Sequence, residues 1–113
     1  MIIFAFSTKT TKILPRIICR HYRHVAPIII DTNNQMVMYQ FVRYKKIVPI
    51  PVNKHGLRLL KQHGWLFIQT NKKTILDNIN NSISCVDLAK RISNIYAPYI
   101  QTPDALYKMI AYK

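Results

Sequence analysis

The chain has 113 residues, half of them hydrophobic, and carries 17 Lys and Arg against four Asp and Glu, for a formal net charge of +13. This length and apolar fraction predict one small domain spanning residues 1–113 and exclude a disordered tail. The charge favours an anionic partner such as a nucleic acid, a membrane surface or another polyanion, but abundant Ile, Lys and Asn are equally typical of an AT-rich genome.

Targeting and membrane signals are weak in this sequence. The first apolar run, residues 2–6, is too short for a signal-peptide core, and no run approaches the roughly 18 apolar residues of a spanning helix. The two cysteines, Cys19 and Cys85, cannot form a disulfide framework and neither has a zinc-like spacing. We therefore expect a cytoplasmic protein with no transmembrane segment, no metal and no cofactor.

The first part of the chain alternates strand and helix patterns. Residues 2–7 (IIFAFS) indicate a short strand, and residues 10–22 place apolar side chains on one stripe of a helix. Residues 24–30 and 35–42 are β-rich runs around the turn sequence DTNN, which predicts a hairpin. Pro27 is then expected on an edge or at a bulge.

The middle of the chain is extended, then helical, then extended again. Residues 45–52 are expected to be extended because two prolines forbid a regular helix. Residues 54–64 predict a short helix, residues 65–70 predict a strand after a glycine turn, and the polar residues 71–81 predict a loop.

The last strong pattern is an amphipathic helix that begins at Cys85, followed by a second helix behind the Thr-Pro pair at residues 102–103. Ser84 or Ser82 is the expected cap of the first helix. Its apolar face recurs at i, i+3, i+4, i+7 and i+10, as Cys85, Leu88, Ala89, Ile92 and Ile95. The sequence thus predicts an α+β fold in which a small antiparallel sheet packs on the helix that carries Cys85.

Cys85 allows two interpretations. A thiol in the first turn of a helix lies near unpaired N–H groups and the positive end of the helix dipole, which favour the reactive thiolate. Asp87 opposes this effect because it brings a second negative charge. The alternative is that Cys85 is a small apolar residue packed in the core.

Histidine is the usual partner of a reactive thiol, and His24 is the best candidate in this chain. It opens the most strand-like run, which would give its ring a fixed orientation. His21 lies at the end of the preceding helix pattern, and His55 and His63 are expected at the surface.

Several short motifs in this order resemble a known family. They are the strand IIFAFS, the helix KILPRIICRHY, the segment RHV that opens a hairpin, a segment with HGW, and SCVDLAKRI followed by APYIQTPDALYKMI. Together they resemble the small circularly permuted papain-like proteins of the NlpC superfamily, including compact phage and bacterial versions. In those proteins, as in the lecithin:retinol acyltransferase relatives, the histidine strand precedes the cysteine helix. The resemblance spans residues 2–110.

The resemblance implies a catalytic site. Cys85 would be the nucleophile and His24 the general base, and a polar residue on the adjacent strand would orient the imidazole. Gln40 is preferred to Asp31 for this third position, because its amide accepts an N–H without adding charge. The backbone N–H groups of Cys85 and Val86 would be the oxyanion donors. The chain departs from the family in lacking a clear acid or histidine at the third position and in having Ser, where some relatives have Asn, before the cysteine.

The leading expectation is a thiol hydrolase or acyltransferase that cleaves an amide or ester bond through a Cys85 acyl-enzyme. Its substrate would be a peptide, a cell-wall peptide or a lipid acyl bond. One alternative is a catalytically inert papain-like binding module. Another is a small basic nucleic-acid-binding or structural protein of phage type. That protein would use Lys45, Lys46, Lys72, Lys73, Lys90 and Arg91, with Tyr44 nearby.

Overall fold

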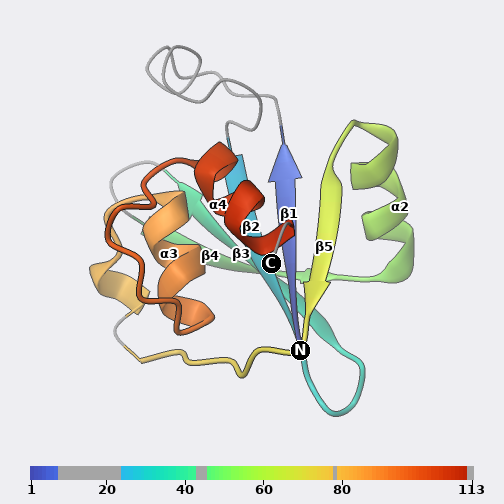
Figure 1. The fold of residues 1–113 in the computed structure, drawn as a ribbon. Coiled ribbons are helices and arrows are strands. Elements are labelled where there is room, and N and C mark those ends of the chain that lie inside the picture. The colour runs from blue at the N-terminus through green and yellow to red at the C-terminus, as the bar shows by residue number, and fades with distance from the viewer. Residues whose placement is uncertain (8–23, 43–45, 78, 112–113) are drawn as a thin grey trace.

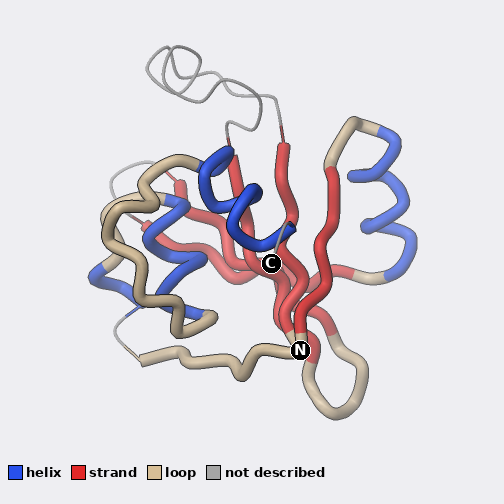
Figure 2. Tube along the Cα trace, viewed as in Figure 1, coloured by secondary structure: helices blue, strands red, loops and turns tan. Residues whose placement is uncertain are grey.

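A five-stranded antiparallel sheet forms the centre of the computed structural model, which describes residues 1–7, 24–42, 46–77 and 79–111 (Figures 1 and 2). The predicted α+β class and antiparallel sheet are confirmed, whereas the predicted helix at residues 10–22 lies outside the described residues. The strands follow the order β4-β3-β2-β1-β5 across the sheet. They are β1 (Ile2–Ser7), β2 (His24–Ile30), β3 (Met36–Val42), β4 (Lys46–Val52) and β5 (Leu66–Thr70).

Helices cover both faces of this sheet (Figure 1). In chain order the helical elements are α2 (Lys54–Gln62), the short 3₁₀ turn η2 (Ile79–Asn81), α3 (Cys85–Ile92) and α4 (Pro103–Ala111). Helices α3 and α4 pack against one face, which we call the α3 face, and α2 packs against the opposite one, the α2 face. The helix that carries Cys85 therefore packs on the sheet, as predicted.

Strand β1 supplies both cores because all six of its residues are buried. Successive side chains of a strand point to opposite faces. Phe4 and Phe6 accordingly join Leu88 of α3 and Leu106 of α4 on the α3 face. On the α2 face the buried residues are Ile3, Ala5, Ala26, Ile28 and Met38, with Leu57 and Leu60 of α2 packed against them.

The predicted β2–β3 hairpin is confirmed, and Asp31 builds its turn. The Asp31 Oδ1 atom accepts hydrogen bonds from the backbone N–H groups of Asn33 (2.8 Å) and Gln35 (2.9 Å). Asn34 has a φ of 60°, a left-handed conformation that Asn tolerates better than most residues. The DTNN sequence therefore fixes the turn through local hydrogen bonds.

The sequence predicted Pro27 on an edge or at a bulge, and of these two the edge strand is wrong. Pro27 pairs with Phe4 of β1 in the interior of the sheet, since β2 lies between β1 and β3. In the described strands, however, the ladder between β2 and β3 covers only residues 28–30 of β2. Pro27 therefore stands where β2 parts from β3, so the N–H that it lacks is not needed for that ladder.

Two other prolines do lie on an edge. Pro49 and Pro51 belong to β4, the outermost strand beside β3, and they pair with Tyr39 and Val37. A proline fits an edge strand when its nitrogen points away from the neighbouring strand, because no N–H is then missing from the ladder. The prediction of an extended segment here is confirmed.

Side-chain caps and a glycine turn set the limits of the helices. The Asn53 side chain accepts from the Gly56 N–H at the start of α2, and Gly64 turns the chain into β5 with a φ of 92°. At the start of α4, the Thr102 hydroxyl accepts from the Ala105 N–H. The predicted helix near residue 54 and the predicted Thr-Pro cap are both confirmed.

Helix α3 is shorter than the apolar pattern predicted. Ser84 is its cap, accepting from the Asp87 N–H (3.0 Å), whereas the Ser82 hydroxyl donates to the Ile79 carbonyl. The helix ends at Ile92, and Asn94 follows with a left-handed φ of 55°. Ile95 therefore lies beyond the helix, although it still packs against the α3 face.

The burial of β1 can be tested by removing one large side chain. Phe4 is fully buried, so Phe4→Ala should lower the free energy of unfolding by about 3–5 kcal/mol. Leu59→Ala, at an exposed position of α2, should cost about 0.5 kcal/mol or less. Urea denaturation followed by circular dichroism measures both values, and equal losses would contradict the central position of β1.

Candidate functional site

His24 and Gln40 are brought together by the structure. His24 is the first residue of β2, and its Nε2 atom lies 2.8 Å from Oε1 of Gln40 on β3. Extending the β2–β3 register would place Gln40 opposite Ala26, in the region where the two strands have already parted. The side-chain hydrogen bond therefore bridges the gap between the separated strand ends.

Asp31, the other candidate for orienting the imidazole, is not placed to do so. It follows the last residue of β2, whereas His24 is the first, and seven residues of strand span roughly 23 Å. Its carboxylate also accepts from two backbone N–H groups of the hairpin turn. Gln40 is thus the polar side chain that the fold places beside His24.

The surroundings of His24 belong to the α2 face. Its ring meets the ring of Trp65 edge to face, with 5.8 Å between centroids, and Trp65 packs against the core of that face. The Gln40 side-chain amide donates to Met38 Sδ (3.0 Å), and Met38 is buried in the same core. His24, Gln40 and Trp65 therefore form one cluster on the α2 face.

Cys85 is the first residue of α3 and is half-buried. Asp87, in the same first turn, accepts from the Ile83 N–H (3.1 Å) and from Nε of Arg91 (3.0 Å). These bonds hold the carboxylate beside the helix start and balance its charge. The thiol therefore lies at the amino end of a well-capped helix, next to the backbone of Val86.

The two halves of the predicted catalytic pair pack on different faces of the sheet. Cys85 packs against the core of the α3 face, together with Val25. His24 precedes Val25 in β2, so its side chain points to the other face, where it meets Trp65. The fold thus joins His24 to Gln40 and sets Cys85 across the sheet from them.

The basic residues singled out in the sequence do not form one patch. Lys90 Nζ donates to the carbonyl oxygens of Ala97 (3.1 Å) and Ile100 (2.6 Å), and Arg91 binds Asp87. Both side chains are therefore partly occupied within the fold. Lys46 lies exposed on β4, Lys72 and Lys73 follow β5, and Lys45 and Tyr44 fall outside the described residues.

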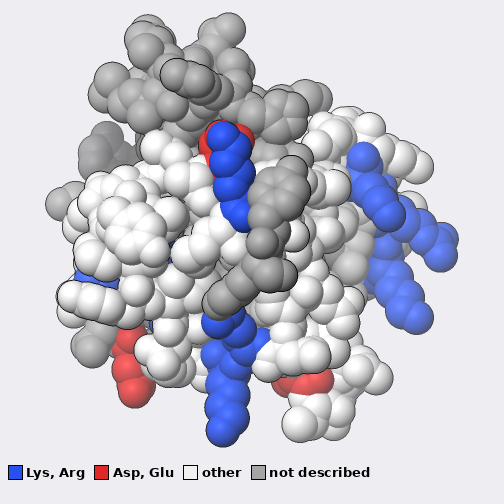
Figure 3. All heavy atoms as spheres, viewed as in Figure 1, with Lys and Arg blue, Asp and Glu red and all other residues white. Residues whose placement is uncertain are grey.

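A basic stripe that the sequence reasoning missed lies on α2. Lys54, Arg58 and Lys61 are all exposed and recur at i, i+4 and i+7, which places them on one side of the helix. Figure 3 shows basic side chains projecting over α2 at the right of the molecule. The i, i+4, i+7 spacing was the signal that could have found this stripe.

The α2 stripe carries its charge without local compensation. Helix α2 contains no acidic residue, and within the described part of the chain none of Lys54, Arg58 and Lys61 forms an ion pair. The ion pairs that are seen join Arg91 to Asp87 and Lys108 to Asp104, on α3 and α4. The stripe is therefore a concentrated positive surface.

Comparison with known proteins identifies no relative: the sequence matches no protein-family model, no curated protein and no solved structure. Every helix among the described residues is too short or too polar to cross a membrane. In the same part of the chain, no three His, Cys, Asp or Glu side chains are grouped as metal ligands.

The separation of Cys85 from His24 can be tested by alkylation. Thiol reactivity follows the charges and hydrogen bonds around the sulfur, so His24→Ala should leave the rate of Cys85 alkylation by iodoacetamide within about twofold of wild type. Mass spectrometry of the Cys85 peptide measures this rate without interference from Cys19. A fall of about tenfold or more at pH 6 would contradict the separation, because it would require His24 to act on the thiol.

Proposed function

We propose that this protein binds nucleic acid and that the α2 stripe is its main contact with the phosphate backbone. The observation that carries the proposal is the set of exposed basic residues on one side of α2, Lys54, Arg58 and Lys61, in a helix with no acidic residue. Lysine and arginine are the side chains that neutralise phosphates and release condensed counterions, which supplies most sequence-independent affinity.

The dimensions of the stripe suit this role. Lys54 and Lys61 are seven residues apart, so at 1.5 Å per residue the stripe covers about 10 Å of helix. One strand of a duplex advances about 3.4 Å per phosphate along its axis, so the stripe can face about three phosphates. The match supports contact with the backbone and does not require reading of base sequence.

The placement of the acidic residues also supports the proposal. Asp87 and Asp104 each bind a basic residue one turn further along their own helix, at 3.0 Å and 3.3 Å. Asp31 is bound by backbone N–H groups of its turn. Three of the four acidic side chains thus bind groups close to them in sequence. The net charge of +13 therefore gives the rest of the surface a positive potential.

The papain-like resemblance is compatible with this function. We propose that the chain has a permuted papain-like fold used as a catalytically inert binding module. The order of β1, the β2–β3 hairpin, α3 and α4 supports this fold assignment. Nucleic-acid binding through α2 does not involve Cys85.

A second candidate function is the thiol hydrolase or acyltransferase. Two observations favour it: Cys85 is the first residue of a capped helix, and His24 has the amide partner that would orient an imidazole base. The packing of Cys85 and His24 on different faces of the sheet counts against it, which makes it the second candidate. The substrate would be a peptide, a cell-wall peptide or an acyl ester. This candidate needs His24 to act on Cys85, so the alkylation experiment decides it. Loss of Cys85 reactivity in His24→Ala would make it the leading function.

The salt dependence of binding tests the proposed contact. Three neutralised phosphates predict a slope of about −2.7 for log affinity against log salt on a duplex. Replacing Arg58 and Lys61 together with Gln should weaken binding and reduce the slope by about 1.8, at about 0.9 for each phosphate that is no longer neutralised. Fluorescence anisotropy of a labelled duplex at several salt concentrations measures both quantities.

The matched control removes two exposed charges elsewhere. Lys46→Gln with Lys73→Gln changes the net charge equally, at two exposed lysines that form no ion pair within the described residues, and leaves the α2 stripe intact, so its slope should stay close to that of the wild type. Equal effects of the two double variants would mean that binding depends on the overall positive charge and not on the α2 stripe. Undetectable binding of the wild type at low salt would reject the function altogether.

A further inference from the structure

The loop between α3 and α4, residues 93–102, displays two tyrosines to solvent. Tyr96 is 94% exposed and Tyr99 is 78% exposed, while Ala97 and Ile100 of the same loop are buried. Exposed tyrosine rings lack the hydrophobic stabilisation that burial would give them. Each exposed tyrosine is followed by a buried residue, so another interaction must hold the loop in this conformation.

Lys90 holds the loop in this conformation through two hydrogen bonds to its backbone. Its Nζ atom donates to the carbonyl oxygens of Ala97 and Ile100, which lie three residues apart in the loop. Ser93 holds the loop entrance, since its hydroxyl donates to the Ala89 carbonyl (2.7 Å). The two tyrosines are thus presented by a braced loop.

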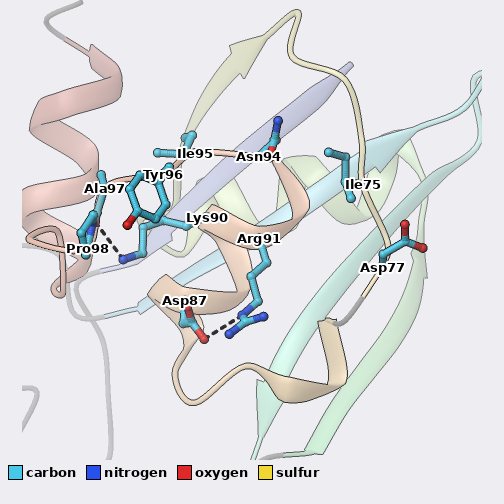
Figure 4. Close-up of a pocket in the computed structure, with 10 residues that line it drawn as sticks. All are labelled: Ile75, Asp77, Asp87, Lys90, Arg91, Asn94, Ile95, Tyr96, Ala97 and Pro98. Atoms are coloured by element: carbon cyan, nitrogen blue, oxygen red, sulfur yellow. Dashed lines mark hydrogen bonds and ion pairs between the residues drawn. The ribbon is translucent and has the colours of Figure 1, made fainter.

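A hollow of about 440 Å³ lies beside Tyr96, in the size range of small-ligand sites. It opens over the outer side of α3, between the braced loop and the segment that precedes η2. In Figure 4, Tyr96 and Pro98 lie at one end of the lining and Asp77 at the other, with Arg91 between them. Tyr99 does not line this hollow.

The polar groups of the hollow can both donate and accept. Arg91 uses Nε for Asp87, so its two terminal guanidinium nitrogens remain as donors. The Asp77 carboxylate accepts only, and within the described structure it has no ion-pair partner. The Asn94 amide has both kinds of group. The lining also includes Asp87, which is paired with Arg91, and Lys90, whose Nζ atom is held by the loop carbonyls.

We propose that this hollow binds an unpaired base of a single-stranded nucleic acid, with the base stacked on Tyr96. The inference rests on the proposed function and narrows its ligand from nucleic acid in general to strands with exposed bases. Aromatic side chains offer a stacking platform for any base, and nearby arginine and lysine hold the backbone. Arg91 and Asn94 can donate to a phosphate or to a base edge, whereas Asp77 can only accept, from an amino group of a base.

A single strand fits the hollow better than a duplex or a peptide. Bases in a duplex are stacked on one another, so their faces cannot reach Tyr96. A proline-rich peptide also docks on exposed aromatic rings. Such a peptide, however, would make no use of the chain's net charge of +13. A single-stranded nucleic acid has both negative charge and flat rings, so it can use the positive charge of the chain and the exposed ring of Tyr96.

The test compares single-stranded and duplex binding of Tyr96 variants of the full chain. The probe is a fluorescein-labelled eight-nucleotide single strand at low salt, with a duplex of the same sequence alongside. Tyr96→Ala should weaken single-strand binding about tenfold, because one base loses its stacking platform. Tyr96→Phe should stay near wild type, because it keeps the ring. Duplex affinity should be unchanged in both variants.

Tyr99→Ala is the matched control. It removes an exposed tyrosine of the same loop that does not line the hollow, so single-strand binding should hardly change. The inference is overturned if Tyr96→Ala binds the single strand like wild type, or if it loses single-strand and duplex affinity equally. Both variants replace exposed side chains, and thermal unfolding checks that each remains folded.

Failure of this inference is distinguishable from failure of the α2 contact. Suppose that the Arg58 and Lys61 double variant weakens binding of both the single strand and the duplex, while Tyr96→Ala weakens neither. The α2 contact is then supported and the base site is rejected. If Tyr96→Ala weakens only the single strand while the α2 variant changes nothing, the base site stands and α2 is rejected.

Discussion

Strand β1 is buried on both faces, and this constraint organises the rest of the molecule. A strand with two apolar faces must be covered on each side, so a single layer of helices cannot satisfy it. Helix α2 covers one face with Leu57 and Leu60, and α3 and α4 cover the other with Leu88 and Leu106. The two faces are thereby separated, and side chains of neighbouring residues in one strand enter different environments.

This separation determines which groups remain for function. The apolar sides of α3 and α4 are committed to the core, and the polar groups of α3 are largely used to hold its own ends. Lys90 is the clearest example, because its cationic head satisfies two loop carbonyls. Exposed groups of α2 and of the loop that Lys90 braces remain accessible to a partner.

Local signals in the sequence predicted much of this architecture. The DTNN turn, the Ser84 cap and the Thr-Pro start of α4 were predictable because each depends on hydrogen bonds within a few residues. Ile95 was wrongly extended into α3, since an apolar period continues even where the backbone turns at Asn94. The edge position expected for Pro27 was wrong because β1 pairs with the other side of β2, and the residues around Pro27 do not encode where β2 parts from β3.

The candidate site was only partly predictable for the same reason. The proximity of His24 and Gln40 follows from a hairpin, whose partners are close in sequence. The relation of Cys85 to His24 depends on which face of the sheet α3 covers, and no local pattern encodes that choice. The internal role of Lys90 was equally hidden, because a lysine on an amphipathic helix has the same sequence pattern whether its ammonium meets solvent or carbonyl oxygens.

The prolines of β4 make the two borders of the sheet unequal. Pro49 and Pro51 leave two gaps in the row of outward donors that a further strand would need, whereas β5, at the other border, contains no proline. A sheet that can be extended on one side only can pair with a second copy once, border to border. Growth into a continuous fibril would need both borders, and Pro49 and Pro51 make pairing through β4 unfavourable.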